Sequence, residues 1–156
     1  MRCRGFTLIE MVVTVAIVGL LATAVFPLAE LGVRRAKEQE LRLALRTIRT
    51  GLDAYKAAAD QGRIELEVGD SGYPKTLHSL VDGVVDSKSA DAEMIYFIRR
   101  LPRDPFYPDP SLPAAETWML RSYASPPDNP QSGVDIYDVI SQSQQIGING
   151  IPYNEW

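Results

Sequence analysis

The sequence is poor in the residues that build metal centres and covalent cross-links. Among its 156 residues it has one cysteine, Cys3, and one histidine, His78. A single cysteine cannot form a disulfide within the chain, and a lone histidine is a weak basis for a zinc site or a catalytic triad. The formal net charge of −4 argues against general binding to nucleic acid. With no phosphate-binding loop or nucleophile arrangement either, we expect neither an enzyme nor a nucleic-acid-binding protein.

The sequence does have one long hydrophobic run, which extends from Gly5 to Ala29. No side chain ionises between Met11 and Ala29, and at about 1.5 Å per helical residue this stretch is long enough to cross a hydrocarbon core of about 30 Å. Arg2 and Arg4 precede the run, and their positive charges should keep that end on the cytoplasmic side. We therefore predict a transmembrane helix over residues 6–29.

Glu10 is the one acidic residue within this run. A carboxylate costs about 2.5–3.5 kcal/mol at the centre of a membrane helix and less near the interface, and a nearby cation offsets that cost. No Lys or Arg lies between Gly5 and Glu10, whereas a cut after Gly5 would create an α-amine on Phe6. Phe6 and Glu10 stand four residues apart, so we expect them to share a helical face. The amine of a neighbouring copy could serve instead, and the pair would then set the register between subunits.

The string from Arg4 to Glu10, RGFTLIE, resembles the cleavage and methylation motif of type IV pilins and type II secretion pseudopilins. Gly5, Phe6 and Glu10 match that motif position for position, and Pro27 matches a proline that many relatives carry. The resemblance implies that a membrane peptidase cuts after Gly5 and methylates the new N-terminal Phe6. It also implies that Phe6, Glu10 and Pro27 take part in assembly, with Glu10 pairing with the N-terminus of an adjacent subunit.

Two simpler interpretations of the hydrophobic run are open. A secretory signal peptide also has a basic start and an apolar core, and residues 22–24, Ala-Thr-Ala, would serve as its cleavage site. A plain single-pass anchor is the other. Both leave Glu10 and the surrounding motif without an explanation.

The resemblance implies three parts in the chain. Residues 1–5 form a leader peptide that is cleaved, residues 6–29 a transmembrane and assembly helix, and residues 30–156 a periplasmic pilin-like globular domain. That domain includes the second half of the long helix.

Pro27 removes one backbone hydrogen bond within the helical pattern, so we expect a kink or local melting near it.

Beyond residue 29 the apolar residues are spaced for one buried face of a helix. They step by three and four positions: Leu41, Leu45, Ile48, Leu52, Tyr55 and Ala59. The charged residues between Arg34 and Arg49 should be solvated, or else contact acidic surfaces of other subunits or lipid headgroups. Gln61 and Gly62 should end the helix.

Two later segments are typical of β-strands. Residues 118–125 and 135–141 are rich in aromatic and β-branched side chains, and turn-forming residues separate them. We predict an antiparallel hairpin packed on the long helix, with room for a third, shorter strand before Trp118. This order of elements gives an α+β pilin fold. Before the hairpin, prolines between positions 102 and 113 predict a stiff loop over the core, and the order of residues 101–106 resembles major pseudopilins. Trp156 should pack back onto the body.

The resemblance also raises calcium, because well-known major pseudopilins bind this ion in the loop before the C-terminus. Calcium takes six to eight oxygen ligands, several of them from carboxylates. The comparable stretch here, residues 141–150, has no carboxylate, and Glu155 is the only acid beyond Asp138. We therefore expect no metal and no other cofactor. The loop should instead be held by amide hydrogen bonds and by inward packing of three isoleucines, Ile146, Ile148 and Ile151.

The function that the resemblance implies is structural. The chain would be a subunit of a type II secretion pseudopilus, akin to the major pseudopilins of the G class, that polymerises through its apolar helix and supports export of folded proteins across the outer membrane. It would span the inner membrane once, with the C-terminal domain in the periplasm. The implied partners are copies of itself, minor pseudopilins, the prepilin peptidase/methyltransferase, an inner-membrane assembly platform and the lipid bilayer.

Two alternatives remain for the function. The first is a type IV pilin or DNA-uptake pseudopilin, although many large adhesion pilins carry a C-terminal disulfide loop for which this chain lacks the cysteines. The second is a membrane-anchored periplasmic binding domain, in which Glu10 would have no role.

Overall fold

The computed structural model describes residues 5–156, apart from the side chains of residues 24–27. The chain divides into two compact units between Lys37 and Glu38, and each unit is described by itself. The partition into residues 1–5, 6–29 and 30–156 stays a prediction, because its boundaries refer to cleavage and membrane insertion, which compactness does not test.

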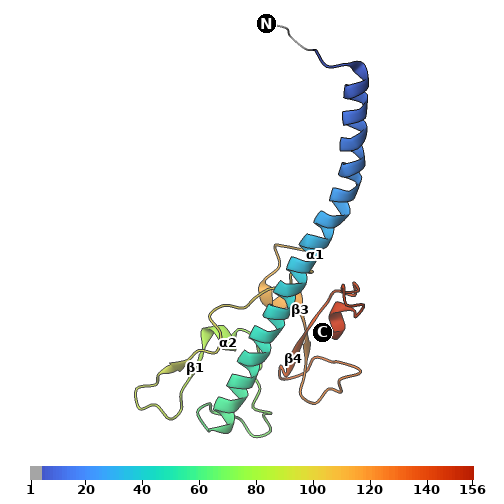
Figure 1. The fold of residues 1–156 in the computed structure, drawn as a ribbon. Coiled ribbons are helices and arrows are strands. Elements are labelled where there is room, and N and C mark those ends of the chain that lie inside the picture. The colour runs from blue at the N-terminus through green and yellow to red at the C-terminus, as the bar shows by residue number, and fades with distance from the viewer. Residues whose placement is uncertain (1–4) are drawn as a thin grey trace. The chain divides into compact units, whose positions relative to one another are not determined.

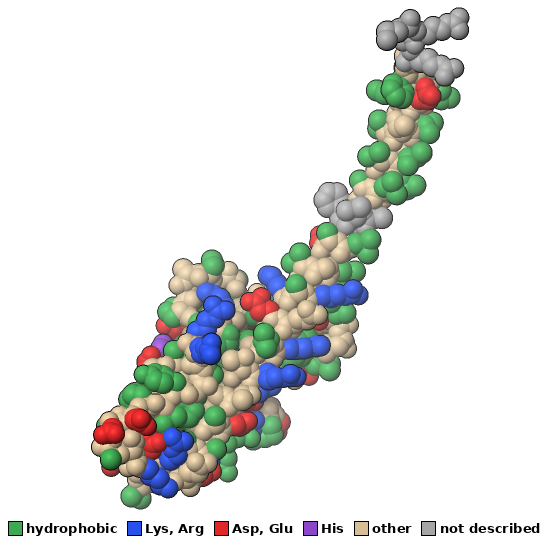
Figure 2. All heavy atoms as spheres, turned by 60° about the vertical axis from the view of Figure 1, so that its left-hand side comes forward, with side chains coloured by type: hydrophobic (Ala, Val, Ile, Leu, Met, Phe, Trp, Pro, Cys, Tyr) green, Lys and Arg blue, Asp and Glu red, His purple; other side chains and the backbone are tan. Residues whose placement is uncertain are grey.

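One helix dominates both units. α1 (Leu8–Asp60) is 53 residues long, and Figure 1 shows it as the blue-to-green coil. In the first unit its described side chains are almost all exposed, including Leu20 at 73% and Ile9 at 70%. Figure 2 shows hydrophobic side chains along the visible face of this stretch of the helix. By length and composition it can cross a membrane. A helix that is apolar all round requires lipid or other apolar surfaces around it.

The backbone stays helical across Pro27, so the local melting considered for that residue does not occur. The side chains of residues 24–27 lie outside the described part of the structure. The predicted role of Pro27 in assembly therefore also lies outside it.

In the second unit α1 buries one face. The predicted stripe is confirmed, since all six of its residues are buried and Leu41 and Ile48 are fully enclosed. The helix ends at Asp60, and Gly62 follows with a φ of +67°, a left-handed conformation that suits glycine after a helix. The rest of the core comes from later segments: Ile64, Leu77, Leu80, Ile98, Trp118, Ile136, Val139 and Tyr153.

The strands form two separate sheets. β3 (Trp118–Arg121) pairs antiparallel with β4 (Asp138–Ser141), which confirms the predicted hairpin. β1 (Val84–Val85) and β2 (Met94–Ile95) pair only with each other. The α+β pilin-like class is confirmed, but the single small sheet of the prediction is two sheets of two strands. The short elements around them are helices: α2 (Ser79–Asp82), η1 (Ala114–Thr117) and η2 (Tyr153–Glu155).

In the described residues 5–156, the element directly before β3 is the helix η1 and not a strand, so the predicted third strand of this sheet is absent there; β1 and β2 lie earlier in the chain and form their own sheet. The stiff proline-rich loop does lie over the core, as predicted. The indole N–H of Trp118 donates to the carbonyl of Pro102 over 2.9 Å, and the ring of Phe106 stacks on Tyr153 with 4.0 Å between centroids. Within the loop, Asp104 is buried and accepts a hydrogen bond from the Ser141 hydroxyl at 2.6 Å. That bond ties the loop to β4.

Asp135 fixes the segment that enters β4. Its buried carboxylate accepts hydrogen bonds from the Ser122 hydroxyl at 2.5 Å and from the Tyr123 amide at 2.9 Å. Burial raises the pKa of Asp135, but hydrogen bonds from Ser122, Ser71 and Tyr123 outweigh burial, so the net pKa lies below its usual 3.8. The ionised form of this carboxyl therefore stabilises the fold.

A lowered pKa in the folded state predicts a specific pH dependence. The stabilisation from Asp135 is fully present above the ordinary pKa of 3.8 and is lost as the pH falls through the lower folded value. We expect Asp135→Asn to lower the melting temperature of the detergent-solubilised chain at pH 6, with the difference from wild type narrowing below about pH 4. Asp128→Asn, in an exposed loop, is the matched control. A difference that stayed constant with pH would contradict this assignment.

Candidate functional site

The first turn of α1 forms a reciprocal cap between Thr7 and Glu10. The Thr7 amide and hydroxyl donate to Oε2 of Glu10 at 2.9 and 2.8 Å, and the Glu10 amide donates to the Thr7 hydroxyl at 3.3 Å. This arrangement is a capping box, in which two residues three positions apart satisfy each other's backbone donors. The carboxylate also lies at the positive end of the helix dipole. Glu10 thus has partners within its own chain.

Thr7 was not predicted as a partner of Glu10. The signal was present as the spacing Thr-x-x-Glu before an apolar run, which is typical of a helix start. The structure also shows where Phe6 lies relative to the start of the helix. In the uncut chain Phe6 lies before the helix, which begins at Leu8. The shared face was predicted for the chain cut after Gly5 and stays a prediction. Phe6 is 83% exposed.

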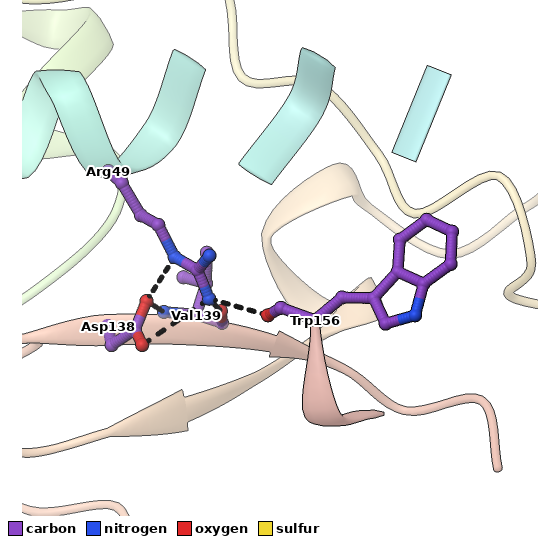
Figure 3. A network of polar contacts seen from close by, with 4 residues as sticks. All are labelled: Arg49, Asp138, Val139 and Trp156. Atoms are coloured by element: carbon purple, nitrogen blue, oxygen red, sulfur yellow. Dashed lines mark hydrogen bonds and ion pairs between the residues drawn. The ribbon is translucent and has the colours of Figure 1, made fainter. Parts of the chain in front are cut away.

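A second group of polar contacts joins α1 to the end of the chain. Figure 3 shows Arg49 reaching from α1 towards Asp138, Val139 and Trp156. Its Nε donates to Asp138 Oδ1 at 2.7 Å, and its Nη2 donates to the carbonyl oxygens of Trp156 at 2.9 Å and Val139 at 3.3 Å. One planar guanidinium thus binds three groups on two segments, which a lysine ammonium could not do in the same geometry.

Glu38 and Arg42 extend these contacts along the same face of α1. Oε1 of Glu38 accepts hydrogen bonds from the Ile148 amide at 2.7 Å and from the Tyr153 hydroxyl at 2.9 Å. The guanidinium carbon of Arg42 lies 4.5 Å from the ring centroid of Trp156, within range of a cation–π interaction. The prediction that charged residues here are simply solvated is wrong for Glu38, which is only 6% exposed, and for Arg49.

Trp156 packs against the core, as predicted, but the three isoleucines near it do not turn inward. Ile146, Ile148 and Ile151 are 58%, 43% and 45% exposed, so the prediction that they hold the loop by packing is wrong. Amide hydrogen bonds do hold it. The Gly147 amide donates to the Ile151 carbonyl at 2.8 Å, and Tyr153 fills the core in place of the isoleucines.

The residues of this loop do not fit a calcium ion. The oxygens that the sequence offered as ligands are bound to the loop's own N–H groups: Ser143 donates its amide to the Ser141 hydroxyl, and Ile151 donates its amide to Oδ1 of Asn149. Among residues 5–156, no three His, Cys, Asp or Glu side chains are grouped to hold a metal. Calcium requires several oxygens directed at one point, and here they are directed elsewhere.

The comparisons with known proteins agree on one family. A family model described as the prokaryotic N-terminal methylation motif matches residues 1–26. The type II secretion system core protein G of Klebsiella pneumoniae is 33% identical over 113 residues, which cover 69% of this chain and 72% of that protein. The protein of the same name from Vibrio cholerae is 27% identical over 146 residues, covering 92% and 84%. No solved structure matches the chain significantly.

The long N-terminal helix with its capped glutamate, packed in its second half against antiparallel strands, defines the chain as a pilin-like protein. The extent of the similarity then places it more narrowly. The chain belongs to the type II secretion system core protein G family, the major pseudopilins.

The contacts of Arg49 predict the effect of a conservative change. Arg49→Lys keeps the charge but replaces the guanidinium, which has several N–H donors in one plane, with a single ammonium. The ammonium cannot bind Asp138 and the Trp156 carbonyl together. We expect the melting temperature of the full-length chain in detergent to fall by about 2–4 °C. Arg46→Lys, at an exposed position of the same helix, should leave it unchanged. Equal melting temperatures for Arg49→Lys and wild type would rule out a structural role for the guanidinium of Arg49.

Proposed function

We propose that this chain is a structural subunit of a type II secretion pseudopilus. The precursor is held in the inner membrane, cut after Gly5 and N-methylated at Phe6. The mature chains polymerise through the apolar half of α1, and the filament supports export of folded proteins across the outer membrane. The chain acts as a building unit and not as an enzyme.

One observation carries this proposal: an acidic side chain sits at the start of an exposed, apolar helix. The apolar side chains of that helix find suitable surroundings either in lipid or among the helices of neighbouring subunits. Glu10 would be unfavourable in a plain membrane anchor, where a leucine would serve better. Its position therefore favours a role in ordering subunits.

The capping contact supplies a route from membrane to filament. Before assembly, Thr7 hydrogen-bonds the Glu10 carboxylate and lowers the cost of placing it close to lipid. During assembly the ammonium of a neighbour's Phe6 binds the same carboxylate, and opposite charges in apolar surroundings fix the axial position of one subunit against the next. Cleavage after Gly5 is required, because it creates that ammonium.

The membrane arrangement and the partners follow from the same mechanism. Residues 6–29 span the inner membrane, and the globular domain lies in the periplasm, where the pseudopilus forms. The chain assembles with copies of itself and with minor pseudopilins. It is processed by the prepilin peptidase/methyltransferase and is moved from the bilayer into the filament by an inner-membrane assembly platform.

Two variants test the mechanism in cells that carry the secretion apparatus. Gly5→Val should block cleavage and leave an uncut precursor that forms no filaments. Glu10→Leu should be cut and folded normally, yet form no filaments, because the new amine has no carboxylate to meet. The measurements are the mass and N-terminal sequence of the membrane-bound chain and the amount of filament released by shearing.

Glu30→Leu is the matched control, since Glu30 is an exposed acid on the same helix. It should be cut and assembled like the wild type. A mature chain that begins anywhere but at Phe6 would overturn the processing step. Normal filaments from Glu10→Leu would overturn the assembly mechanism while leaving the processing step intact.

A further inference from the structure

We propose that the carboxylate of Glu38 holds the C-terminal segment, defined here as residues 142–156, onto α1 and makes the fold of the second unit independent of divalent cations. The resemblance to major pseudopilins suggested that a calcium ion holds this loop. In this chain a carboxylate of α1 holds it instead. The inference concerns the folding of one chain and does not depend on how the chains assemble.

The first support is the location of Glu38. It is the first residue of the second unit, it is 6% exposed, and it faces the C-terminal segment across 110 and 115 positions of sequence. A buried carboxylate is unfavourable unless donors surround it. Ile148 supplies an amide and Tyr153 a hydroxyl, both at hydrogen-bonding distance, and bonds of this kind to a charged acceptor are stronger than neutral ones.

The second support is the polarity of the loop. A loop that wraps a cation directs carbonyl and carboxylate oxygens at a common point. This loop instead directs an N–H and an O–H at the carboxylate of Glu38, while Oδ1 of Asn149 accepts from the Ile151 amide within the loop. The N–H and O–H donors of this segment point at an anion. To bind a cation at the same place, the segment would have to direct oxygen atoms there instead.

The third support is the tight closure of the loop around Gly147. A Cβ at this position would lie 2.7 Å from the Trp156 ring and 2.6 Å from Oδ1 of Asn149. The Gly147 amide donates to Ile151, and the Gly150 amide donates to Gly147. This region is closed by backbone and side-chain contacts of its own.

Arg42 and Arg49 complete the attachment. With Glu38 they lie at intervals of four and seven residues, which places all three on one face of α1. Arg42 covers the ring of Trp156, and Arg49 binds its carbonyl oxygen. The C-terminal segment is thus fixed at two places along the helix, by an acid near Ile148 and by two arginines at Trp156.

The first experiment compares metal-loaded and metal-free protein. The full-length chain in detergent would be melted in calcium chloride and, separately, in EDTA, and its amide hydrogen exchange would be followed by mass spectrometry under both conditions. We expect the same melting temperature and the same exchange in peptides covering residues 146–153. A calcium-dependent rise in melting temperature, or calcium-dependent protection of those peptides, would overturn the proposal.

The second experiment removes the carboxylate. Glu38→Ala leaves the Ile148 amide and the Tyr153 hydroxyl without their acceptor, so we expect the melting temperature to fall by roughly 5 °C or more. Exchange should rise in residues 146–153 in particular. Glu40→Ala, an exposed acid two positions along the same helix, is the matched control. If the Glu38 and Glu40 variants behaved alike, Glu38 would not hold the segment.

Tyr153→Phe keeps the test decisive if Glu38→Ala fails to fold. It removes one hydroxyl and retains the aromatic ring that stacks on Phe106. Glu38→Gln keeps an acceptor oxygen but removes its charge, and Tyr153→Phe removes the donor. The double change should therefore cost less than the sum of the single changes, because both act on the same bond. Strict additivity would show that the two side chains do not act on each other, and would contradict the proposed contact.

Discussion

The structure depends on one constraint: a single continuous helix has to satisfy two different environments. Up to residue 29 the described side chains of α1 are almost all apolar, and from Leu41 on the helix buries one stripe and exposes charges. A helix that is apolar all round gains nothing from a neighbouring sheet in water, whereas an amphipathic one requires it. The pattern changes near Glu30, shortly before the boundary between the two units after Lys37, and the backbone is helical on both sides of that change.

Two glutamates on α1 are satisfied in related ways. Glu10 accepts hydrogen bonds from Thr7 at the start of the helix, and Glu38 accepts them from Ile148 and Tyr153 at the start of the second unit. Both carboxylates are held by N–H and O–H donors. Such donors stabilise an anion without neutralising it. Glu10 lies at the exposed start of α1, where the proposed mechanism gives it a partner in a neighbouring subunit, whereas Glu38 is enclosed by the C-terminal segment of its own chain.

Much of the fold follows from periodicity, and much of the site does not. The stripe from Leu41 to Ala59 and the hairpin of β3 and β4 could be predicted from the sequence, because burial imposes regular spacing on helices and strands. The cap of Glu10 was also readable, from the Thr-x-x-Glu spacing. The burial of Glu38 was not, because helical spacing shows which face a residue occupies but not which distant loop will cover that face. The outward orientation of Ile146, Ile148 and Ile151 could not be predicted for the same reason, because Tyr153 occupies the core position instead.

The composition of the C-terminal loop and the sequence of α1 together determine how the loop is held on the helix. Residues 141–150 offer no carboxylate to a calcium ion, and the Ile148 amide and the Tyr153 hydroxyl require an acceptor where they meet the helix. An acid on the helix removes that difficulty, because it accepts from the amide and the hydroxyl that the loop presents. It also ties the loop to the element that runs through both units. An ion could be lost from the loop, whereas a side chain of α1 forms this contact whenever the chain folds.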